Sequence, residues 1–273
     1  MRHPPFNCRN KYWYLWTMEI SPVGNMRRIF TEIGNLTRFT GMFFRNLFGG
    51  RFETREFINQ CFRIGYQSLL LISITAIILG LVLTIQTRPI LADLGAEAWL
   101  PNMVFISIIT EMGPVIFALL FAGKVGSGIG AELSSMRVTE QIDAMEVSAT
   151  NPIKFLVVTR VMATTFMLPL LVFYGDLMSF LGSFLGLKAY SDISFQLFYS
   201  RAFSDFFFRD LFPATIKTIF FGFFIGIISS YMGYYSDRGT EGVGRSANSA
   251  VVVSSLAIFL LDLIAVQITD LVL

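Results

Sequence analysis

The chain has 273 residues and a formal net charge of +2, with 54% hydrophobic and only 15% charged residues. With a mean hydropathy of +0.62, it is too apolar for an ordinary soluble domain. The single histidine, His3, leaves no histidine-dependent catalytic triad or zinc site. Cys8 and Cys61 have neither metal-ligand spacing nor the pattern of a disulfide framework. The composition therefore argues against soluble enzyme chemistry and predicts no metal site.

The first predicted element is an amphipathic helix over residues 26–60. Residues 1–25 precede it as a tail, which either is poorly ordered or extends upstream of the natural start. The helix either lies in the cytoplasmic membrane interface or packs as a cytoplasmic helix. We favour the interface, because the chain enters the bilayer directly afterwards. The apolar residues that recur at steps of three and four are Ile29, Ile33, Leu36, Phe43 and Leu47.

Five apolar segments follow, and they predict an all-α polytopic membrane protein. The first carries no charge and exceeds the ~20 residues that cross a hydrocarbon core of ~30 Å. The third is longer than one span needs, so we expect it to overrun the bilayer or to bend near Gly182 and Gly186. Together with the first helix they make one membrane domain over residues 26–273. The predicted spans are 64–87, 99–123, 155–187, 211–235 and 246–272.

Basic residues are distributed unequally between the two sides of these spans. Lysine and arginine are frequent up to residue 63, within 124–160 and at 238–245, but rare in the other loops. Positive residues gather in loops that stay in the cytoplasm. We therefore expect a cytoplasmic amino terminus and, with five spans, an external carboxyl terminus.

The glycine-rich stretch AGKVGSGIGAE does not match a nucleotide-binding loop. A P-loop has serine or threonine after its lysine, whereas Val125 follows Lys124 here. We expect these glycines to serve helix packing and a turn where a span ends. The sequence thus predicts that this chain binds no ATP by itself.

The internal loop 130–160 contains a predicted amphipathic helix over 131–147. This stretch has no proline or glycine, and its apolar stripe includes Leu133 and Ile142. Pro152 marks its end, because the residue before a proline avoids the helical region. The helix either caps the bundle or docks a soluble partner in the helix-in-groove mode, and periodicity alone leaves both open.

The stretch EMGPVIFALLFAGKVGSGIGAELSSMRVTEQIDAMEVSATNPIKFLVVTRVMA resembles the central region of the MlaE-type permeases of ABC transporters, also called YrbE-like or MCE-associated. In that family an E-[LM]-G-P helix leads through A-G-[RK]-x-G-[SA] into a helix close to A-E-x-x-x-M-[RK]-x-T-E-Q. GLVLTIQ, IKTIFFG and VSSLAIFLLD extend the resemblance, which runs from about residue 43 to the end. The outside connection 187–210 is aromatic-rich in its own way.

The resemblance implies a homodimer with an interfacial amino-terminal helix and five membrane helices per subunit. It also implies a dimer of a cytoplasmic ABC ATPase, which binds ATP and magnesium, and a periplasmic MCE-domain protein. Such complexes move phospholipids or related lipids between the inner membrane and the outer envelope, with no nucleic acid and no cofactor on the permease. The coupling helix of the family falls on 131–146 here. Its expected contacts with the ATPase are Glu132, Met136, Arg137, Glu140, Gln141, Asp143 and Glu146.

The charged residues inside the predicted spans are Glu111, Asp176, Lys217 and Asp262. Each costs about 2.5–3.5 kcal/mol at the centre of an isolated helix, so each should face protein or water. We expect Asp176 and Asp262 to bond between helices or to lie near an interface. By resemblance, Glu111 and Lys217 face a central lipid cavity, to which Pro114 and Gln86 are also assigned.

Direct pairing of Glu111 with Lys217 stays open at this point. If the pair only stabilises the bundle, Glu111→Gln would leave Lys217 without a partner. If both residues instead meet lipid headgroups, which we favour, either single change would leave folding nearly intact.

Two other classes of function remain open. One is a proton-coupled secondary transporter with Glu111, Asp176 and Asp262 as a relay, and the other is a non-transporting membrane scaffold. Secondary transporters often contain inverted repeats, and none is visible between the halves of this chain. We therefore favour a permease subunit without catalytic residues of its own.

Overall fold

The computed structural model describes residues 22–49, 52–204, 208–237 and 239–272. The chain divides into one compact unit through Gly41 and a second unit from Met42 onward. The first unit contains the greater part of helix α1 (Pro22–Leu47). The second contains the end of α1 and all the elements that follow.

The first helix is shorter than the sequence predicts. α1 ends at Leu47 and α2 (Thr54–Asp93) begins seven residues later, so the predicted helix over 26–60 is divided and residues 54–60 belong to the first membrane helix. Gly49 and Gly50 follow α1 in the sequence. Each glycine disfavours a helix by about 1 kcal/mol relative to alanine, which explains the end of α1 here.

Five helical stretches in the described residues are long and apolar enough to cross a membrane, which confirms the predicted all-α polytopic fold. Four of them extend beyond the predicted bounds at one end or both, and the fourth stretch matches the predicted 211–235 to within one residue. They are α2, Glu97–Val138, Ile153–Lys188, Leu211–Tyr234 and Thr240–Leu271.

The α-helices within the last four stretches are α3 (Leu100–Ser107), α4 (Gly113–Phe121), α5 (Ser127–Val138), α7 (Thr159–Lys188), α9 (Phe208–Tyr234) and α10 (Thr240–Val272). Two short helices, α6 (Gln141–Val147) and α8 (Phe195–Ala202), lie between the long ones.

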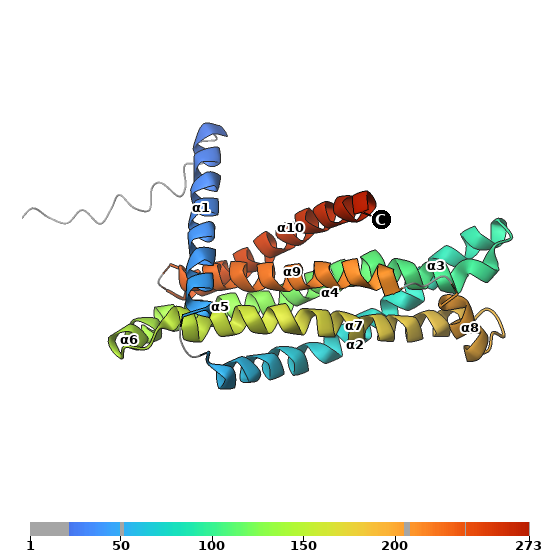
Figure 1. The fold of residues 1–273 in the computed structure, drawn as a ribbon, viewed down its shortest axis with the longest axis horizontal. Coiled ribbons are helices and arrows are strands. Elements are labelled where there is room, and N and C mark those ends of the chain that lie inside the picture. The colour runs from blue at the N-terminus through green and yellow to red at the C-terminus, as the bar shows by residue number, and fades with distance from the viewer. Residues whose placement is uncertain (1–21, 50–51, 205–207, 238, 273) are drawn as a thin grey trace, which may run out of the picture. The chain divides into compact units, whose positions relative to one another are not determined.

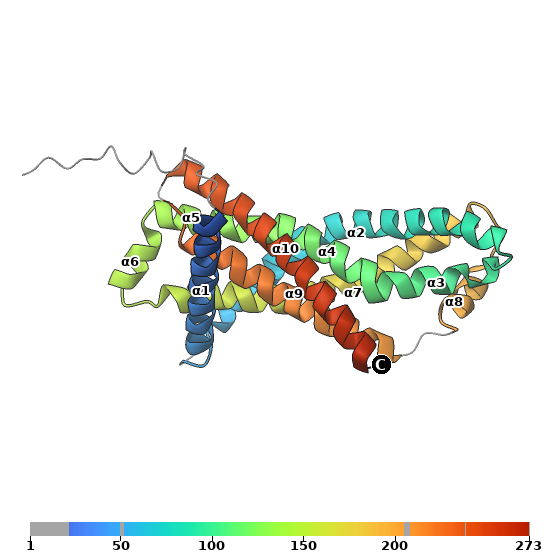
Figure 2. The same cartoon turned by 90° about the horizontal axis from the view of Figure 1, so that it is seen from above.

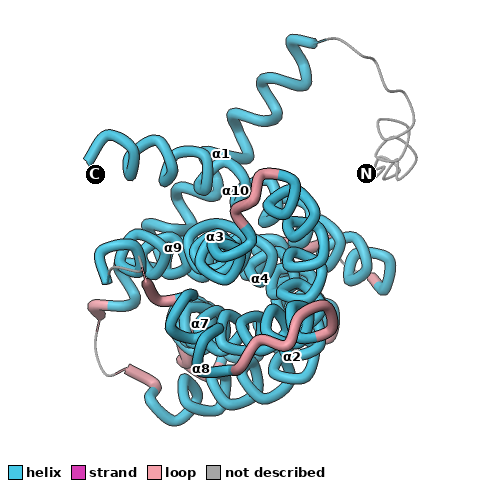
Figure 3. The backbone as a smooth tube through the Cα atoms, turned by 90° about the vertical axis from the view of Figure 1, so that its right-hand side faces the viewer, coloured by secondary structure: helices cyan, strands magenta, loops and turns pink. Residues whose placement is uncertain are grey.

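Within the second unit the long helices run side by side, with α6 at one end and α8 at the other (Figure 1). Seen along the bundle, α4 lies in the middle (Figure 3), where it packs against α2, α7, α9 and α10. α10 packs against α5 and α9 and runs obliquely across the other long helices (Figure 2). The motif-bearing segment therefore passes through the centre of the bundle from the α8 end to the α6 end.

Small residues let α2 and α7 approach closely. A Cβ atom at Gly80 would overlap the backbone carbonyl of Ser179, and one at Gly182 would overlap the backbone of α2. The hydroxyl groups of Thr84 and Ser183 lie 2.7 Å apart across the same contact. Such close contacts hold membrane helices together where the bilayer supplies no hydrophobic driving force. α7 is one continuous α-helix to Lys188, with no break at Gly182 or Gly186.

Gly80→Ala is expected to lower the stability of the protein by about 2 kcal/mol, because overpacking a closed contact costs about 1–3 kcal/mol. Gly123→Ala is the matched control, since a Cβ at Gly123 would meet no atom within 4 Å. Thermal unfolding of the detergent-purified variants measures the difference. Equal melting temperatures for the two variants would show that α2 and α7 are not packed through Gly80.

An aromatic core fixes the α8 end of the bundle. The ring of Phe180 on α7 lies 5.3 Å from that of Phe105 on α3 and 5.0 Å from that of Phe198 on α8. Phe198 is fully buried, and Phe105 and Phe180 are nearly so. Aromatic pairs at these separations add about 0.5–1.5 kcal/mol beyond the burial of their area. The three helices therefore form a fixed frame for the side chains around them.

Candidate functional site

Three of the four charged residues inside the spans form one cluster. Lys217 on α9 places its Nζ atom 2.7 Å from Oε1 of Glu111 and 3.2 Å from Oδ1 of Asp262 on α10. The lysine side chain is only 4% exposed, whereas that of Asp262 is 20% and that of Glu111 is 45% exposed. The contact with Glu111 is a hydrogen bond, and that with Asp262 is an ion pair without hydrogen-bond geometry.

The backbone around Glu111 is a widened helical turn. Residues Ile108–Met112 form a π-helical segment between α3 and α4, and Gly113 and Pro114 follow it directly. Proline has no N–H group to donate and its ring crowds the preceding turn, so regular α-helical bonding cannot continue through Pro114. Such π turns occur frequently at functional sites. The Glu-x-Gly-Pro sequence thus places an acidic side chain on a widened turn that faces α9.

The cluster has an excess of negative charge. One ammonium group faces two carboxylates, which leaves a formal charge of −1 when all three are ionised. Lys217 is the buried centre, and Glu111 is the member most open to the surroundings. A buried lysine next to two carboxylates avoids the penalty that an unpaired charge would carry in the bilayer. The carboxylate of Glu111 can therefore accept hydrogen bonds from a ligand while Lys217 keeps Asp262 as its ion-pair partner.

An apolar groove of about 640 Å³ adjoins Lys217 between α9 and α10. Apart from the lysine and Thr269 its lining is entirely apolar, so it can hold a hydrocarbon chain beside a charged group. The apolar residues that line it are Phe212, Pro213, Ile216, Phe220, Phe221, Leu261, Ile264, Ala265 and Ile268.

Pro114 and Gln86, the other two residues assigned to the lipid cavity, are not members of the charge cluster. Pro114 is buried, and it lines a small space beside Asp176 on α7. Gln86 is an exposed residue of α2, a helix that packs chiefly on α7. The structure thus brings together Glu111 and Lys217 and adds Asp262 to them. Gln86 lies on α2, which contributes no residue to this cluster.

Asp176 differs from Asp262, although the sequence suggested one role for both. Asp262 links α10 to α9 through Lys217. Asp176 is buried against Gly113, where a Cβ atom would overlap its Oδ1 atom. That oxygen has no hydrogen-bond partner among the described residues. Gly113 of the Glu-x-Gly-Pro motif therefore leaves space for a carboxyl group of α7.

The predicted coupling helix is two helices with a sharp junction. α5 ends at Val138 and α6 begins at Gln141, so the expected continuous helix over 131–147 is corrected to a helix–turn–helix. Glu140 at the junction has φ = 58°, a left-handed conformation that is uncommon outside glycine. Nη1 of Arg137 lies 2.6 Å from Oδ1 of Asp143, and this ion pair spans the turn.

Glu132, one third exposed, contacts two other helices of the bundle. Its Oε1 atom lies 3.1 Å from Nη1 of Arg63 on α2 and 3.1 Å from Nη2 of Arg160 on α7. The Arg160 side chain is 3% exposed, and its Nη1 also donates to the carbonyl of Leu156 at 2.9 Å. Glu132 therefore joins α5 to two other helices.

The other predicted ATPase contacts, on α5, α6 and the turn between them, differ in their exposure to solvent. Glu140, Gln141 and Glu146 are exposed, whereas Met136, Arg137 and Asp143 are half-buried. Tyr234 donates a long hydrogen bond of 3.5 Å to Glu146, which ties α6 to α9. The outer surface of the element is thus formed chiefly by the junction and the exposed side of α6.

Sequence reasoning missed the partners that complete both clusters. Asp262 carried a signal, because it is a charge within a span, but its helix is remote in sequence from Glu111. Arg63 and Arg160 appeared only as basic residues that mark the orientation of the chain. Their pairing with Glu132 depends on the packing of α2, α5 and α7.

Comparisons with known proteins agree with this arrangement. The family model described as Permease MlaE matches residues 57–268. A probable ABC transporter permease protein of Rickettsia prowazekii is 39% identical over 203 residues, which cover 74% of this chain and 78% of the relative.

Two further relatives are less similar in sequence. A probable ABC transporter permease protein of Synechocystis is 35% identical, with 81% of this chain and 84% of the relative covered. The intermembrane phospholipid transport system permease protein MlaE of Haemophilus influenzae is 32% identical, with 76% and 80% covered. With its five membrane helices and a family match over most of its length, the chain belongs to the MlaE permease family.

Proposed function

We propose that this protein is the membrane-spanning subunit of an ABC transporter that moves phospholipids or related lipids between the inner membrane and the outer envelope. The observation that carries the proposal is the buried Lys217, which binds two carboxylates and borders an apolar groove of about 640 Å³. A charged cluster beside an apolar groove suits an amphipathic ligand. The name of the Haemophilus relative, an intermembrane phospholipid transport permease, supports the same cargo.

Each member of the charge cluster has its own part in this proposal. Glu111, nearly half exposed, accepts hydrogen bonds from the ammonium or hydroxyl groups of a lipid headgroup. Lys217 holds both carboxylates in place, and Asp262 keeps the lysine paired while Glu111 exchanges partners. An acyl chain lies along the groove between α9 and α10.

The permease itself has no catalytic role in this proposal. Hydrolysis of ATP with magnesium takes place on a separate dimeric ATPase, which contacts the α5–α6 element from the cytoplasm. Support comes from the ABC transporter names of the relatives and from the exposed junction at Glu140. Glu132 then carries movement of this element to α2 and α7 through its two arginine partners.

We further propose a homodimer that also binds an MCE-domain protein on the periplasmic side. Of the five candidate spans, α10 has the smallest buried share, 17% of its most apolar window. Its exposed apolar residues, such as Phe259 and Leu263, suit a second copy or lipid. In the dimer the groove beside Lys217 would open toward the partner copy.

The orientation of the chain can be tested with reporter fusions. Fusions after Ser148 and Ser246 are expected to report a cytoplasmic position, and fusions after Ala96, Ser194 and Leu273 an external one, because the basic loops stay inside. An external signal after Ser148 would overturn both the orientation and the docking of the ATPase on the α5–α6 element.

Glu140→Lys is expected to weaken association with the ATPase at least tenfold. The residue is exposed at the junction, and charge reversal at an interface places like charges together at a cost of several kcal/mol. Asp143 is unsuitable for this test, because its carboxylate holds Arg137. Glu53→Lys reverses an exposed charge at the start of α2 and serves as control. Unchanged ATPase binding by Glu140→Lys would mean that this element only caps the bundle.

Copurification followed by lipid mass spectrometry tests the proposed function as a whole. We expect the tagged permease to bring down an ABC ATPase and an MCE-domain protein in fixed ratio, with phospholipid bound. Purified permease that carries phospholipid but neither partner would favour the secondary transporter, and absence of both lipid and partners would favour the scaffold.

A further inference from the structure

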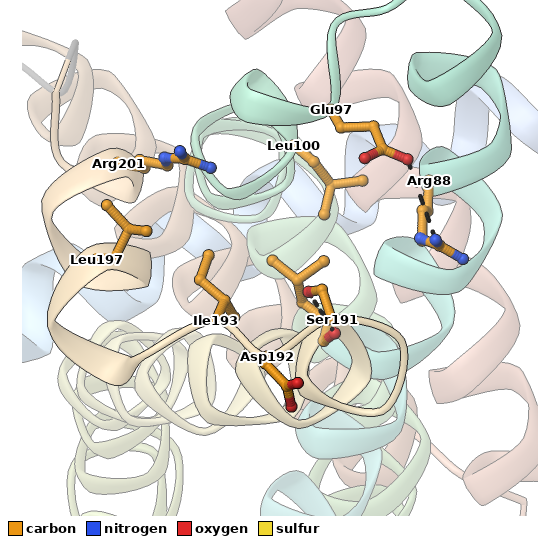
Figure 4. Close-up of a pocket in the computed structure, with 9 residues that line it drawn as sticks. Arg88, Glu97, Leu100, Ser191, Asp192, Ile193, Leu197 and Arg201 are labelled. Carbon is orange, nitrogen blue, oxygen red and sulfur yellow. Dashed lines mark hydrogen bonds and ion pairs between the residues drawn. The ribbon is translucent and has the colours of Figure 1, made fainter.

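A second, polar cavity of about 260 Å³ lies at the α8 end of the bundle (Figure 4). The end of α2 contributes Arg88 to its lining, and the short 3-10 turn before α3 contributes Glu97. Asp192 comes from the loop after α7, and Arg201 comes from α8. None of these residues belongs to the cluster around Lys217.

Arg201 is the basic residue of this cavity that has no ion-pair partner among the described residues. Its guanidinium points from α8 across the cavity toward Leu100 (Figure 4). Among the residues that the structure describes, no carboxylate lies within 4.0 Å of it. Arg88, in contrast, has Glu97 at 4.0 Å and lies over the ring of Tyr190 at 4.9 Å. Within the described residues, one guanidinium of the lining is therefore without a carboxylate partner.

The wall opposite Arg201 is apolar and fixed. Leu100 is 1% and Leu187 is 8% exposed, and both belong to the aromatic core that holds α3, α7 and α8 together. Pockets for drug-sized ligands usually measure about 300–1,000 Å³. A volume of about 260 Å³ is suited to a small polar group with a short apolar stem, such as the headgroup end of a lipid.

Exposed aromatic residues place the cavity at the depth of lipid headgroups. Trp99, Tyr190 and Tyr199 surround this end of the bundle, and each is more than half exposed. Tryptophan and tyrosine gather at the boundary between membrane and water, where their rings lie at headgroup level. A lipid in the adjoining leaflet therefore has its phosphate within reach of Arg201.

The charges of the cavity select among headgroups. Arg88 and Arg201 balance Glu97 and Asp192, so the formal charge of the lining is zero. We infer that this cavity binds the zwitterionic headgroup of a phospholipid, with its phosphate on Arg201 and its ammonium toward the carboxylates of Glu97 and Asp192. An arginine fork binds phosphate in a bidentate manner, and the carboxylates disfavour a headgroup with a second negative charge.

This site needs neither ATP nor transport, so its test is independent of the proposed function. Trp99 precedes the cavity residue Leu100, and the other two tryptophans, Trp13 and Trp16, lie in the amino-terminal tail. In a Trp13→Phe/Trp16→Phe background, the emission of Trp99 reports on this cavity. The full-length protein in detergent is titrated with dihexanoyl phosphatidylethanolamine, dihexanoyl phosphatidylglycerol and inorganic phosphate.

We expect the phosphatidylethanolamine to change the emission of Trp99 in a saturable way. Its half-saturating concentration should be at least tenfold below that of either other probe. Arg201→Gln should raise the half-saturating concentration about tenfold or more, since a charged hydrogen bond is lost. Arg201→Lys should raise it less, because the positive charge remains. Lys188→Gln removes an exposed positive charge outside the cavity and should leave it unchanged.

Equal saturation by inorganic phosphate would show a simple anion site, and equal saturation by phosphatidylglycerol would remove the selectivity. No change with any probe would overturn the site. If Arg201→Gln loses an MCE-domain partner while its lipid titration is unchanged, the cavity receives a protein side chain instead. If Arg201→Gln does not fold, the comparison of the three probes on the protein that keeps Arg201 still tests whether the cavity binds the zwitterionic headgroup.

Discussion

Lys217→Met is expected to destabilise the protein by about 3 kcal/mol or more and to abolish lipid transfer. The substitution leaves the carboxylates of Glu111 and Asp262 close together with no cation between them. Removing one partner of a buried ion cluster costs about 3–5 kcal/mol, because an uncompensated charge stays behind. Thermal unfolding in detergent and transfer by the reconstituted complex measure the two effects. Lys188→Met, at an exposed position, is the control for loss of a positive charge.

Glu111→Gln should behave differently, because Lys217 keeps Asp262 as its partner. If the Glu111–Lys217 pair only stabilised the bundle, this change would leave the lysine without a partner, but Asp262 still lies 3.2 Å from its Nζ atom. We expect a loss of less than about 1 kcal/mol of stability, typical of an exchange at a half-exposed site. Transfer should nevertheless fall at least tenfold, because the open acceptor of the cluster is weakened. Normal transfer by Glu111→Gln would remove Glu111 from the lipid path.

Glu132→Gln is the second substitution with a large expected effect, again about 3 kcal/mol. It leaves Arg160, which is 3% exposed and whose Nε already has no hydrogen-bond partner among the described residues, without a carboxylate. Glu140→Gln makes the same exchange at an exposed position of the same element and should cost less stability than Glu132→Gln.

A double-mutant cycle separates the pair from a general weakening of α5. The double variant Glu132→Gln/Arg160→Met leaves no uncompensated charge at this buried site, so it should recover much of the stability lost in Glu132→Gln. Strictly additive losses in the two single variants and the double variant would mean that Glu132 and Arg160 do not interact.

The membrane helices could be predicted from the sequence, but not their full extent. Hydropathy identifies the part of each helix inside the hydrocarbon, which is why 64–87 lies well within α2 (Thr54–Asp93). The two ends of α2, outside 64–87, are more polar and suit the membrane–water interface. Helices and loops have similar composition there, so hydropathy does not show where the helix begins and ends. Gly182 suggested a bend or an overrun, and in the structure its missing side chain lets α7 approach the backbone of α2 closely.

The candidate site was accessible from the sequence only one residue at a time. A charge in an apolar run identifies Glu111, Lys217 and Asp262 individually, but hydropathy does not tell which of them meet. No glycine or proline marks the junction at Glu140 in the sequence. The ion pair between Arg137 and Asp143 spans this turn, and that contact exists only in the folded chain. Gln86 matched a family motif, but it is an exposed residue of α2, a helix that contributes no residue to the cluster.

ATP-dependent phospholipid transfer between vesicles, by the permease reconstituted with its ATPase and MCE-domain partner, tests the central claim most directly. We predict transfer that requires both ATP and the permease, that persists in Lys188→Met and that is lost in Lys217→Met. Transfer at the same rate without ATP, or with Lys217→Met at its full folded concentration, would contradict the assignment of this protein as a lipid permease working through the Lys217 cluster.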